Sequence, residues 1–274
     1  MGELTKRILV ALVGIPLILF LTYRGSWYFF VLIIIIAVTA QWEFYRLQNN
    51  KHIYPQKFIG IIAGMIILLG IQTGYWFFSG ITTVIILMIM MINEMFRSYK
   101  NISSNMGVTL LGIFYIPLFL GTLLYLREYM QTILKDTSHA GFRFIAVMLA
   151  TIWICDTFAY SFGSKLGRHK LYEKVSPKKS KEGAIAGLIG AILTYAGVKI
   201  TGILPLTWSA VITFGSAVGI IGQTGDLVES WFKRDAGVKD SSALLPGHGG
   251  MLDRFDSLIF LSPAMLILVY FLLS

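Results

Sequence analysis

The stretch PGHGGMLDRFDSLIFLSPAMLILVYFLLS, residues 246–274, joins a charged, glycine-rich segment directly to a long apolar run. The run over 257–273 has the length of a membrane span, because a helix needs about 20 mostly apolar residues to cross a bilayer, with a range of roughly 17–25. Asp253 and Asp256 stand three residues apart immediately before it. Charge is costly so close to the hydrocarbon region. The stretch therefore predicts a membrane-spanning helix with a functional polar end.

The composition of the whole chain indicates an integral membrane protein. Of its 274 residues, 56% are hydrophobic and 14% are charged, whereas soluble domains carry roughly 25% charged residues. The net charge of +9 favours anionic lipid headgroups as partners and gives no reason to expect nucleic acid, because membrane proteins concentrate lysine and arginine in cytoplasmic loops. Since no segment resembles an inter-domain linker, we expect a single membrane domain over 1–274.

Apolar segments of spanning length recur along the chain and predict an all-α, polytopic membrane fold with about nine transmembrane helices. They are 8–23, 26–42, 58–73, 75–93, 106–126, 142–162, 183–203, 206–223 and 257–273. Most lysines and arginines fall in the N-terminal segment and in alternate loops, which include the two long polar loops 163–182 and 224–256. By the positive-inside rule, these segments and the N-terminus lie in the cytoplasm.

The acidic residues gather in one short part of the chain. Of the 14 acids, those between 226 and 256 are Asp226, Glu229, Asp235, Asp240, Asp253 and Asp256. A helix over 225–235 places Asp226 and Glu229 on the same face, because residues three and four apart are neighbours on a helix. The helix dipole favours carboxylates at a helix start, which is the structural alternative for Asp253 and Asp256. It does not account for Asp226 and Glu229, which follow an apolar segment.

Carboxylates at two helix ends indicate a metal site. Mg²⁺ prefers hard oxygen ligands and usually combines one or two carboxylates with phosphates and water. We therefore expect Asp226, Glu229, Asp253 and Asp256 to hold Mg²⁺, with room for a second cation. The segment 246–250 has the turn chemistry to fold back, and its glycines leave backbone N–H groups open to phosphate. The alternative is a purely structural polar hairpin.

Asp156 lies inside the sixth apolar segment, where an ionisable group is a functional candidate by default. The alternative is a buried acid paired with a basic residue of another helix. Lys178 and Lys179 follow in a basic loop that can meet a phosphate or serve only as a solvated cytoplasmic loop. Glu43 and Glu94, near the ends of apolar segments, are expected at the membrane interface.

The segment SWFKRDAGVKDSSALLPGHGGMLDRFDS, residues 230–257, closely resembles the signature of the phosphatidate cytidylyltransferase (CDP-diacylglycerol synthase) family. The segments CDTFAY (155–160), SPKKSKEG (176–183) and GQTGDLVES (222–230) are also similar to segments of that family. The matching signature positions are Ser230, Lys233, Arg234, Lys239, Asp240, His248, Gly249, Gly250, Asp253, Arg254 and Asp256.

The resemblance implies a reaction of phospholipid biosynthesis in which CTP and phosphatidate give CDP-diacylglycerol and pyrophosphate. It implies Mg²⁺, a homodimer, and a multi-pass protein of the bacterial inner membrane with a polar cavity open to the cytoplasm. Within the single domain, 1–141 would supply N-terminal helices, and 142–274 the catalytic helices and cytoplasmic loops.

The resemblance also assigns roles. Catalytic roles fall to Asp226, Lys233, Lys239, Asp240, Asp253 and Asp256. Substrate-binding roles fall to Asp156, Lys178, Lys179, Ser230, Arg234, His248, Gly249, Gly250 and Arg254.

Two alternatives remain beside this reaction. A transporter also uses intramembrane acids and glycines, but it distributes charge through its spans, often in two repeated halves, whereas here the acids cluster near one end. A CTP-dependent lipid kinase needs a base for its hydroxyl nucleophile, and the 230–257 signature disfavours it.

Overall fold

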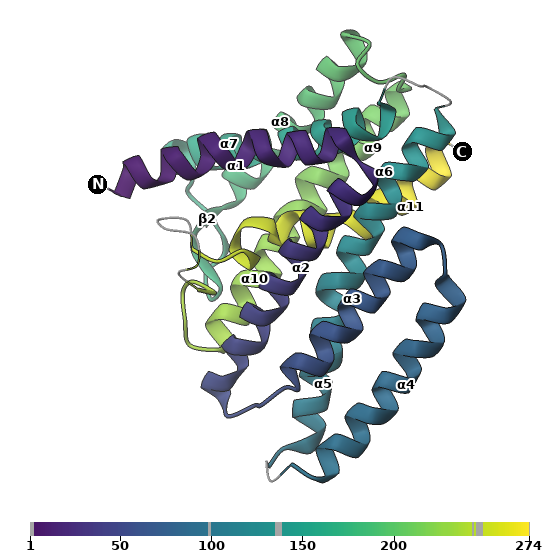
Figure 1. Ribbon diagram of the computed structural model, residues 1–274. Coiled ribbons are helices and arrows are strands. Elements are labelled where there is room, and N and C mark those ends of the chain that lie inside the picture. Colours follow the sequence, from purple (N-terminus) through teal and green to yellow (C-terminus); the bar gives the residue numbers. More distant parts are fainter. Residues whose placement is uncertain (1–2, 98–99, 135–138, 243, 245–248, 274) are drawn as a thin grey trace. The chain divides into compact units, whose positions relative to one another are not determined.

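The computed structural model describes residues 3–97, 100–134, 139–242, 244 and 249–273, with the backbone alone for 3–9. Most of this part of the chain is helical (Figure 1). The helices of the N-terminal half are α1 (Glu3–Arg24), α2 (Ser26–Gln48), η1 (Asn49–Lys51), α3 (Lys57–Thr73), α4 (Trp76–Met95), α5 (Ile102–Ile113), η2 (Phe114–Leu118) and α6 (Phe119–Ile133). Those that follow are α7 (Ala140–Leu166), α8 (Lys181–Ile200), α9 (Trp208–Ala217), η3 (Val218–Gly222), α10 (Gln223–Asp235) and α11 (Leu252–Leu273).

Each apolar segment expected to span the membrane coincides with a helix. Two of these helices are continuous through a π-helical turn, since α5, η2 and α6 follow one another without a break, as do α9, η3 and α10. Among the described residues, seven helices are long and apolar enough to cross a membrane, and Val10–Arg24 and Lys57–Thr73 are apolar but shorter. The all-α polytopic membrane fold is thus confirmed, while the count of nine spans stays a prediction.

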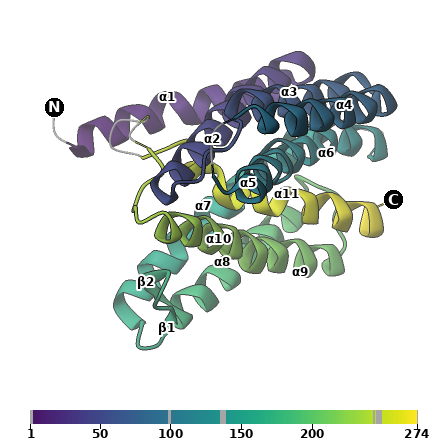
Figure 2. The same cartoon turned by 90° about the horizontal axis from the view of Figure 1, so that it is seen from below.

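The expected polar loop 163–182 contains a β-hairpin instead. Strands β1 (Lys170–Tyr172) and β2 (Ser176–Ser180) pair antiparallel, with Lys170 opposite Ser180. The hairpin contacts α7 and α8, beside which it lies in Figure 2. The second expected loop is also shorter than 224–256, because α10 extends to Asp235 and α11 begins at Leu252.

The described chain forms two compact units, and the division falls inside α6, α10 and α11. The first unit is Met1–Tyr125 with Lys233–Phe255, and the second is Leu126–Phe232 with Asp256–Ser274. In the first unit, α2, α3, α4 and α5 pack side by side (Figure 1). The buried Tyr45 lies at their centre, where its hydroxyl donates to the carbonyl of Thr109 at 2.7 Å.

In the second unit, α8 packs closely on α7, as its small residues predict. A Cβ at Gly187 would lie 3.0 Å from the carbonyl oxygen of Cys155, and one at Gly190 would lie 2.8 Å from the ring of Phe158. These glycines therefore let α8 approach the turn of α7 that also carries Asp156.

Candidate functional site

A close approach of α10 and α11 underlies the site in the second unit. A Cβ at Gly225 would lie 2.6 Å from Cβ of Phe260 and 3.0 Å from the carbonyl oxygen of Asp256. Only glycine lets the two helices meet at this distance. The contact places Asp226, the residue after Gly225, next to the helix turn that carries Asp256.

Three carboxylates and one lysine come together there; we call Asp156, Asp226, Asp256 and Lys179 the acidic cluster. Lys179 Nζ lies 2.5 Å from Asp226 Oδ2. Asp226 is close enough to Asp156 and Asp256 to repel both, and Lys179 attracts both. The cluster thus draws one side chain each from α7, β2, α10 and α11, and three carboxyl groups share one ammonium.

The individual environments within the acidic cluster differ. Asp256 is only 8% exposed, and its Oδ1 accepts a hydrogen bond from the backbone N–H of Ser257 at 2.5 Å. Asp156 is exposed although it belongs to a long apolar helix. Ser230 Oγ lies 3.3 Å from Asp226 Oδ1 and donates to it. An ionisable side chain within an apolar helix is a functional candidate by default.

The hairpin brings Lys179 to the cluster because its end is anchored on α8. Ser180 Oγ accepts a hydrogen bond from the backbone N–H of Gly183 at 3.1 Å and so caps α8. A Cβ at Gly183 would lie 3.0 Å from Cα of Gly163, so α7 and α8 nearly touch beside the cap. The cap thereby sets where the strand ends, and Lys179 is the last residue before it.

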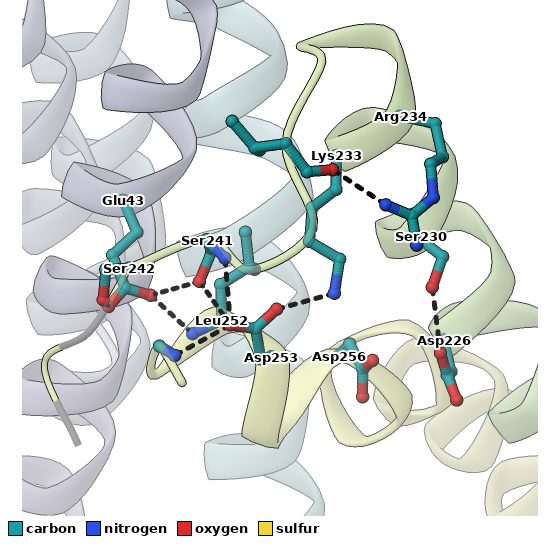
Figure 3. A network of polar contacts seen from close by, with 12 residues as sticks. Glu43, Asp226, Ser230, Lys233, Arg234, Ser241, Ser242, Leu252, Asp253 and Asp256 are labelled. Carbon is teal, nitrogen blue, oxygen red and sulfur yellow. Dashed lines mark hydrogen bonds and ion pairs between the residues drawn. The ribbon is translucent and has the colours of Figure 1, made fainter. Parts of the chain in front are cut away.

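A second polar network joins described residues of the segment between α10 and α11, namely 236–242, 244 and 249–251, which we call the signature loop; they lie in the first unit (Figure 3). Asp253 Oδ1 accepts from Lys233 Nζ at 2.6 Å. Asp253 Oδ2 accepts from the backbone N–H groups of Ser241 at 3.0 Å and Gly250 at 2.7 Å, and from Ser241 Oγ at 2.9 Å. Asp253 therefore holds both ends of the loop to the start of α11.

Two glycines of the loop, Gly249 and Gly250, have a conformation or a close contact that a larger residue would not allow. Gly249 has φ +82°, in the left-handed region that favours glycine. The N–H of Gly250 is already taken by Asp253, whereas we expected it to be open to phosphate. Its missing side chain makes room instead, since a Cβ there would lie 1.9 Å from Ser241 Oγ and 2.6 Å from Glu43 Oε2.

Glu43 was expected at the membrane interface, but its carboxylate is buried and bonded to the signature loop. Glu94 is buried as well, and accepts from Gln56 Nε2 at 2.6 Å and from Arg97 at 2.7 Å. An acid near the end of an apolar helix is a sequence signal for function, although the sequence does not reveal its partner.

The remaining predicted site residues are spread over both units. Glu229 is fully buried in α10, and Arg234 donates to the carbonyl of Val238 at 3.0 Å. Exposed positions are Lys178, Arg234, Lys239, Asp240 and Arg254. His248 lies outside the described residues. Among residues that are described, no three His, Cys, Asp or Glu side chains stand as a ready-made metal-binding group.

The donor chemistry of the acidic cluster nevertheless fits Mg²⁺. Its carboxylates are hard oxygen ligands, and the excess of negative over positive groups leaves charge for a cation to neutralise. Asp226 and Asp256, which come from the contact between α10 and α11, are two carboxylates that could hold such a cation. Asp253, also predicted as a ligand, has both oxygens occupied by donors of the chain, so its role at a metal stays a prediction.

The fold and the site define a multi-pass membrane protein whose charged site is suited to phosphate groups and a cation. The chain belongs to the cytidylyltransferase family, whose family model matches residues 5–272. It is 30% identical over 280 residues to a phosphatidate cytidylyltransferase of Bacillus subtilis (strain 168), covering 100% of this chain and 99% of that protein. It is equally identical, at 30% over 269 residues, to one of Staphylococcus epidermidis (strain RP62A), covering 96% and 98% of the two chains.

A phosphatidate cytidylyltransferase of Staphylococcus aureus (strain COL) is also 30% identical, over 279 residues, with 96% of this chain and 98% of that protein covered. The resemblance noted from the signature is thus confirmed. The chain is an enzyme of the nucleotidyltransferase class, and family membership decides against the transporter alternative.

Proposed function

We propose that this protein transfers CMP from CTP to phosphatidate, giving CDP-diacylglycerol and pyrophosphate for phospholipid biosynthesis. The observation that carries the proposal is the acidic cluster, in which three carboxylates on helices of membrane-spanning length lie beside a lysine of β2. Relatives that this chain matches over 99% and 98% of their length are named phosphatidate cytidylyltransferase. A lipid substrate keeps its acyl chains in the bilayer while its phosphate reaches such a site.

In the proposed reaction, a phosphate oxygen of phosphatidate attacks the α-phosphorus of CTP. The bond between that phosphorus and the oxygen bridging to the β-phosphate breaks, and pyrophosphate leaves with the electron pair. No general base is needed, because the attacking phosphate is already anionic. Catalysis then depends on position and on neutralisation of charge.

The chain's own residues would supply these two effects. Asp226 and Asp256 would hold Mg²⁺, which when bound screens the phosphates and the developing charge of the leaving group. Lys179, now paired with Asp226 at 2.5 Å, is placed to contact a phosphate that enters the cluster. Lys233, Lys239 and Arg254 are the other cations that we assign to phosphate binding, with Arg254 suited to two parallel contacts.

The proposal also covers the membrane location, the orientation and the oligomeric state of the enzyme. We assign it to the inner membrane of a bacterium, with the N-terminus in the cytoplasm, so that CTP arrives from the cytoplasmic side through a polar cavity. We also assign it a homodimeric state. Mass measurement of the detergent-solubilised protein, corrected for bound detergent, tests the dimer, and cysteine accessibility near the N-terminus tests the orientation.

The decisive experiment measures lipid-linked CMP formed by the purified protein in detergent from phosphatidate, labelled CTP and Mg²⁺. We expect the wild type to form CDP-diacylglycerol and Asp226→Asn to lose at least about 10²-fold in rate. Asp235→Asn is the matched control, because it makes the same change in α10 at an exposed acid that pairs with Lys51. A wild type that forms no lipid-linked CMP would contradict the proposed function.

A further inference from the structure

The carboxylate of Glu43 in α2 lies between Ser241 and Ser242 of the signature loop and the start of α11 (Figure 3). The residue is 3% exposed. Its Oε1 accepts from Ser242 Oγ at 2.5 Å and from the backbone N–H of Met251 at 3.0 Å. Its Oε2 accepts from the backbone N–H of Leu252 at 2.8 Å and lies 3.1 Å from Ser241 Oγ, whose single proton it shares with Asp253 Oδ2. All four contacts lie within the first unit.

Two of these contacts cap a helix from a distant part of the chain. The carbonyl of Met251 accepts from the N–H groups of Arg254 and Phe255, each at 3.2 Å, so α11 begins there. The first N–H groups of a helix have no partner within it, and negative charge is favoured at that end. Glu43 satisfies the N–H groups of Met251 and Leu252, a task usually done by a residue next to the helix.

The other two contacts connect Glu43 to Asp253. Ser241 Oγ lies 3.1 Å from Glu43 Oε2 and 2.9 Å from Asp253 Oδ2, so it stands between the two carboxylates. Gly250 packs against Ser241 and Glu43, with no space for a Cβ. Ser241 and the start of α11 thus both connect Glu43 to Asp253.

We infer that Glu43 is a positioning residue for nucleotidyl transfer: it holds the signature loop and the first turn of α11, which presents Asp253, in the geometry that the reaction requires. It acts through Ser241, Ser242 and the start of α11. The inference rests on the proposed function for its effect on turnover, whereas its effect on the loop is independent of the reaction.

A purely stabilising carboxylate would behave differently, and the chain offers one for comparison. Glu94 is 2% exposed, lies in the same unit, and accepts hydrogen bonds from Gln56, Asn105 and Arg97, which all lie outside the signature loop. Glu94→Gln is thus the matched control for Glu43→Gln. Both variants remove one buried negative charge and keep the size of the side chain.

The test combines hydrogen exchange and steady-state kinetics on the full chain in detergent. In Glu43→Gln, we expect the amides of 249–255 to exchange at least about tenfold faster than in the wild type. We expect kcat to fall by about 10²-fold, since small displacements of catalytic groups have effects of this size, while KM for CTP changes less than about threefold. In Glu94→Gln, exchange over 249–255 and kcat should match the wild type, even if Tm falls.

The possible outcomes distinguish a failure of the positioning role of Glu43 from a failure of the proposed reaction. Unchanged exchange over 249–255 in Glu43→Gln, or equal losses of kcat in both variants, would overturn the positioning role. Faster exchange in Glu43→Gln, in a preparation whose wild type forms no CDP-diacylglycerol, would support the anchoring contacts and remove the proposed reaction. If Glu43→Gln does not fold, Ser242→Ala removes one donor from the partly exposed side of the loop. It should raise exchange over 249–255 by a smaller factor, and unchanged exchange there would also overturn the inference.

Discussion

Lys233 Nζ lies 2.6 Å from Asp253 Oδ1, so the last turn of α10 is joined to the first turn of α11 by an ion pair whose side chains are 12% and 10% exposed. The two residues are separated by the whole signature loop. Their pairing explains why the loop can be long and glycine-rich and still have defined ends. Together with the contacts of Ser241 and Gly250, it makes Asp253 the centre of the loop's polar network.

Lys233→Met should lower stability because it leaves Asp253 without its cationic partner in a nearly buried position. Removing one member of a buried pair costs about 3–5 kcal/mol when no other donors remain. Asp253 keeps its bonds to Ser241 and Gly250, so we expect about 1–3 kcal/mol and a lower Tm. The double variant Lys233→Met/Asp253→Asn should recover part of the loss. Strictly additive effects of the two changes on Tm would show that the pair is not coupled.

Lys179 and Lys178 are neighbours in β2 and should differ sharply in their effect on turnover. Lys179 Nζ contacts Asp226, whereas Lys178 is exposed. We expect Lys179→Met to lower kcat/KM by about 10²–10³-fold, the scale for loss of a charge that stabilises a transition state. Lys178→Met should lower it by less than about fivefold at moderate salt, because an exposed charge is screened. Similar losses in the two variants would contradict the assignment of Lys179 to the acidic cluster.

Gly225→Ala should disturb the contact that brings α10 against α11. Its new methyl group would lie 2.6 Å from Cβ of Phe260, and overpacking of this kind costs about 1–3 kcal/mol. Gly222→Ala is the control three residues earlier, where a Cβ meets nothing within 4 Å. We expect Tm and turnover to fall only in Gly225→Ala, as measured by thermal unfolding and by CMP transfer. Equal behaviour of the two variants would contradict a required close approach at Gly225.

Chelation should abolish turnover, and added Mg²⁺ should restore it, because three carboxylates of the acidic cluster share one lysine. Asp256→Asn should raise the half-saturating Mg²⁺ concentration by at least about tenfold, since it removes one hard oxygen ligand. Asp235→Asn, with its exposed side chain, should leave that concentration unchanged. Full activity after chelation would remove the metal from the proposed mechanism.

The sequence predicted the helical membrane fold because span length and apolarity are local properties of each segment. It also placed Asp226 on a helix and Asp253 and Asp256 in the first turns of the last one, since spacing along a helix is local too. The hairpin was missed because β1 and β2 are short and polar, and contacts with α7 and α8 stabilise them more than any pattern of their own.

The contacts within the acidic cluster could not be predicted from local sequence patterns. Asp156 and Lys179 were candidates that each kept a structural alternative, because the neighbouring sequence does not reveal which residue pairs with them. The structure supplies the partner, Asp226, which lies 47 residues beyond Lys179. Packing at Gly183 and Gly225 brings these segments together, and such packing depends on the shapes of two helices at once.

The sequence by itself thus determined the class of fold, the family and the residue types of the site. Only the tertiary structure decided that Glu43, whose partners lie 198 to 209 residues further along the chain, anchors the signature loop. It also decided that Gly250 leaves space for that carboxylate and donates its N–H to Asp253. The physical reason is that a buried charge must find its hydrogen-bond donors in three dimensions, and their distance along the chain leaves no periodic trace in the sequence.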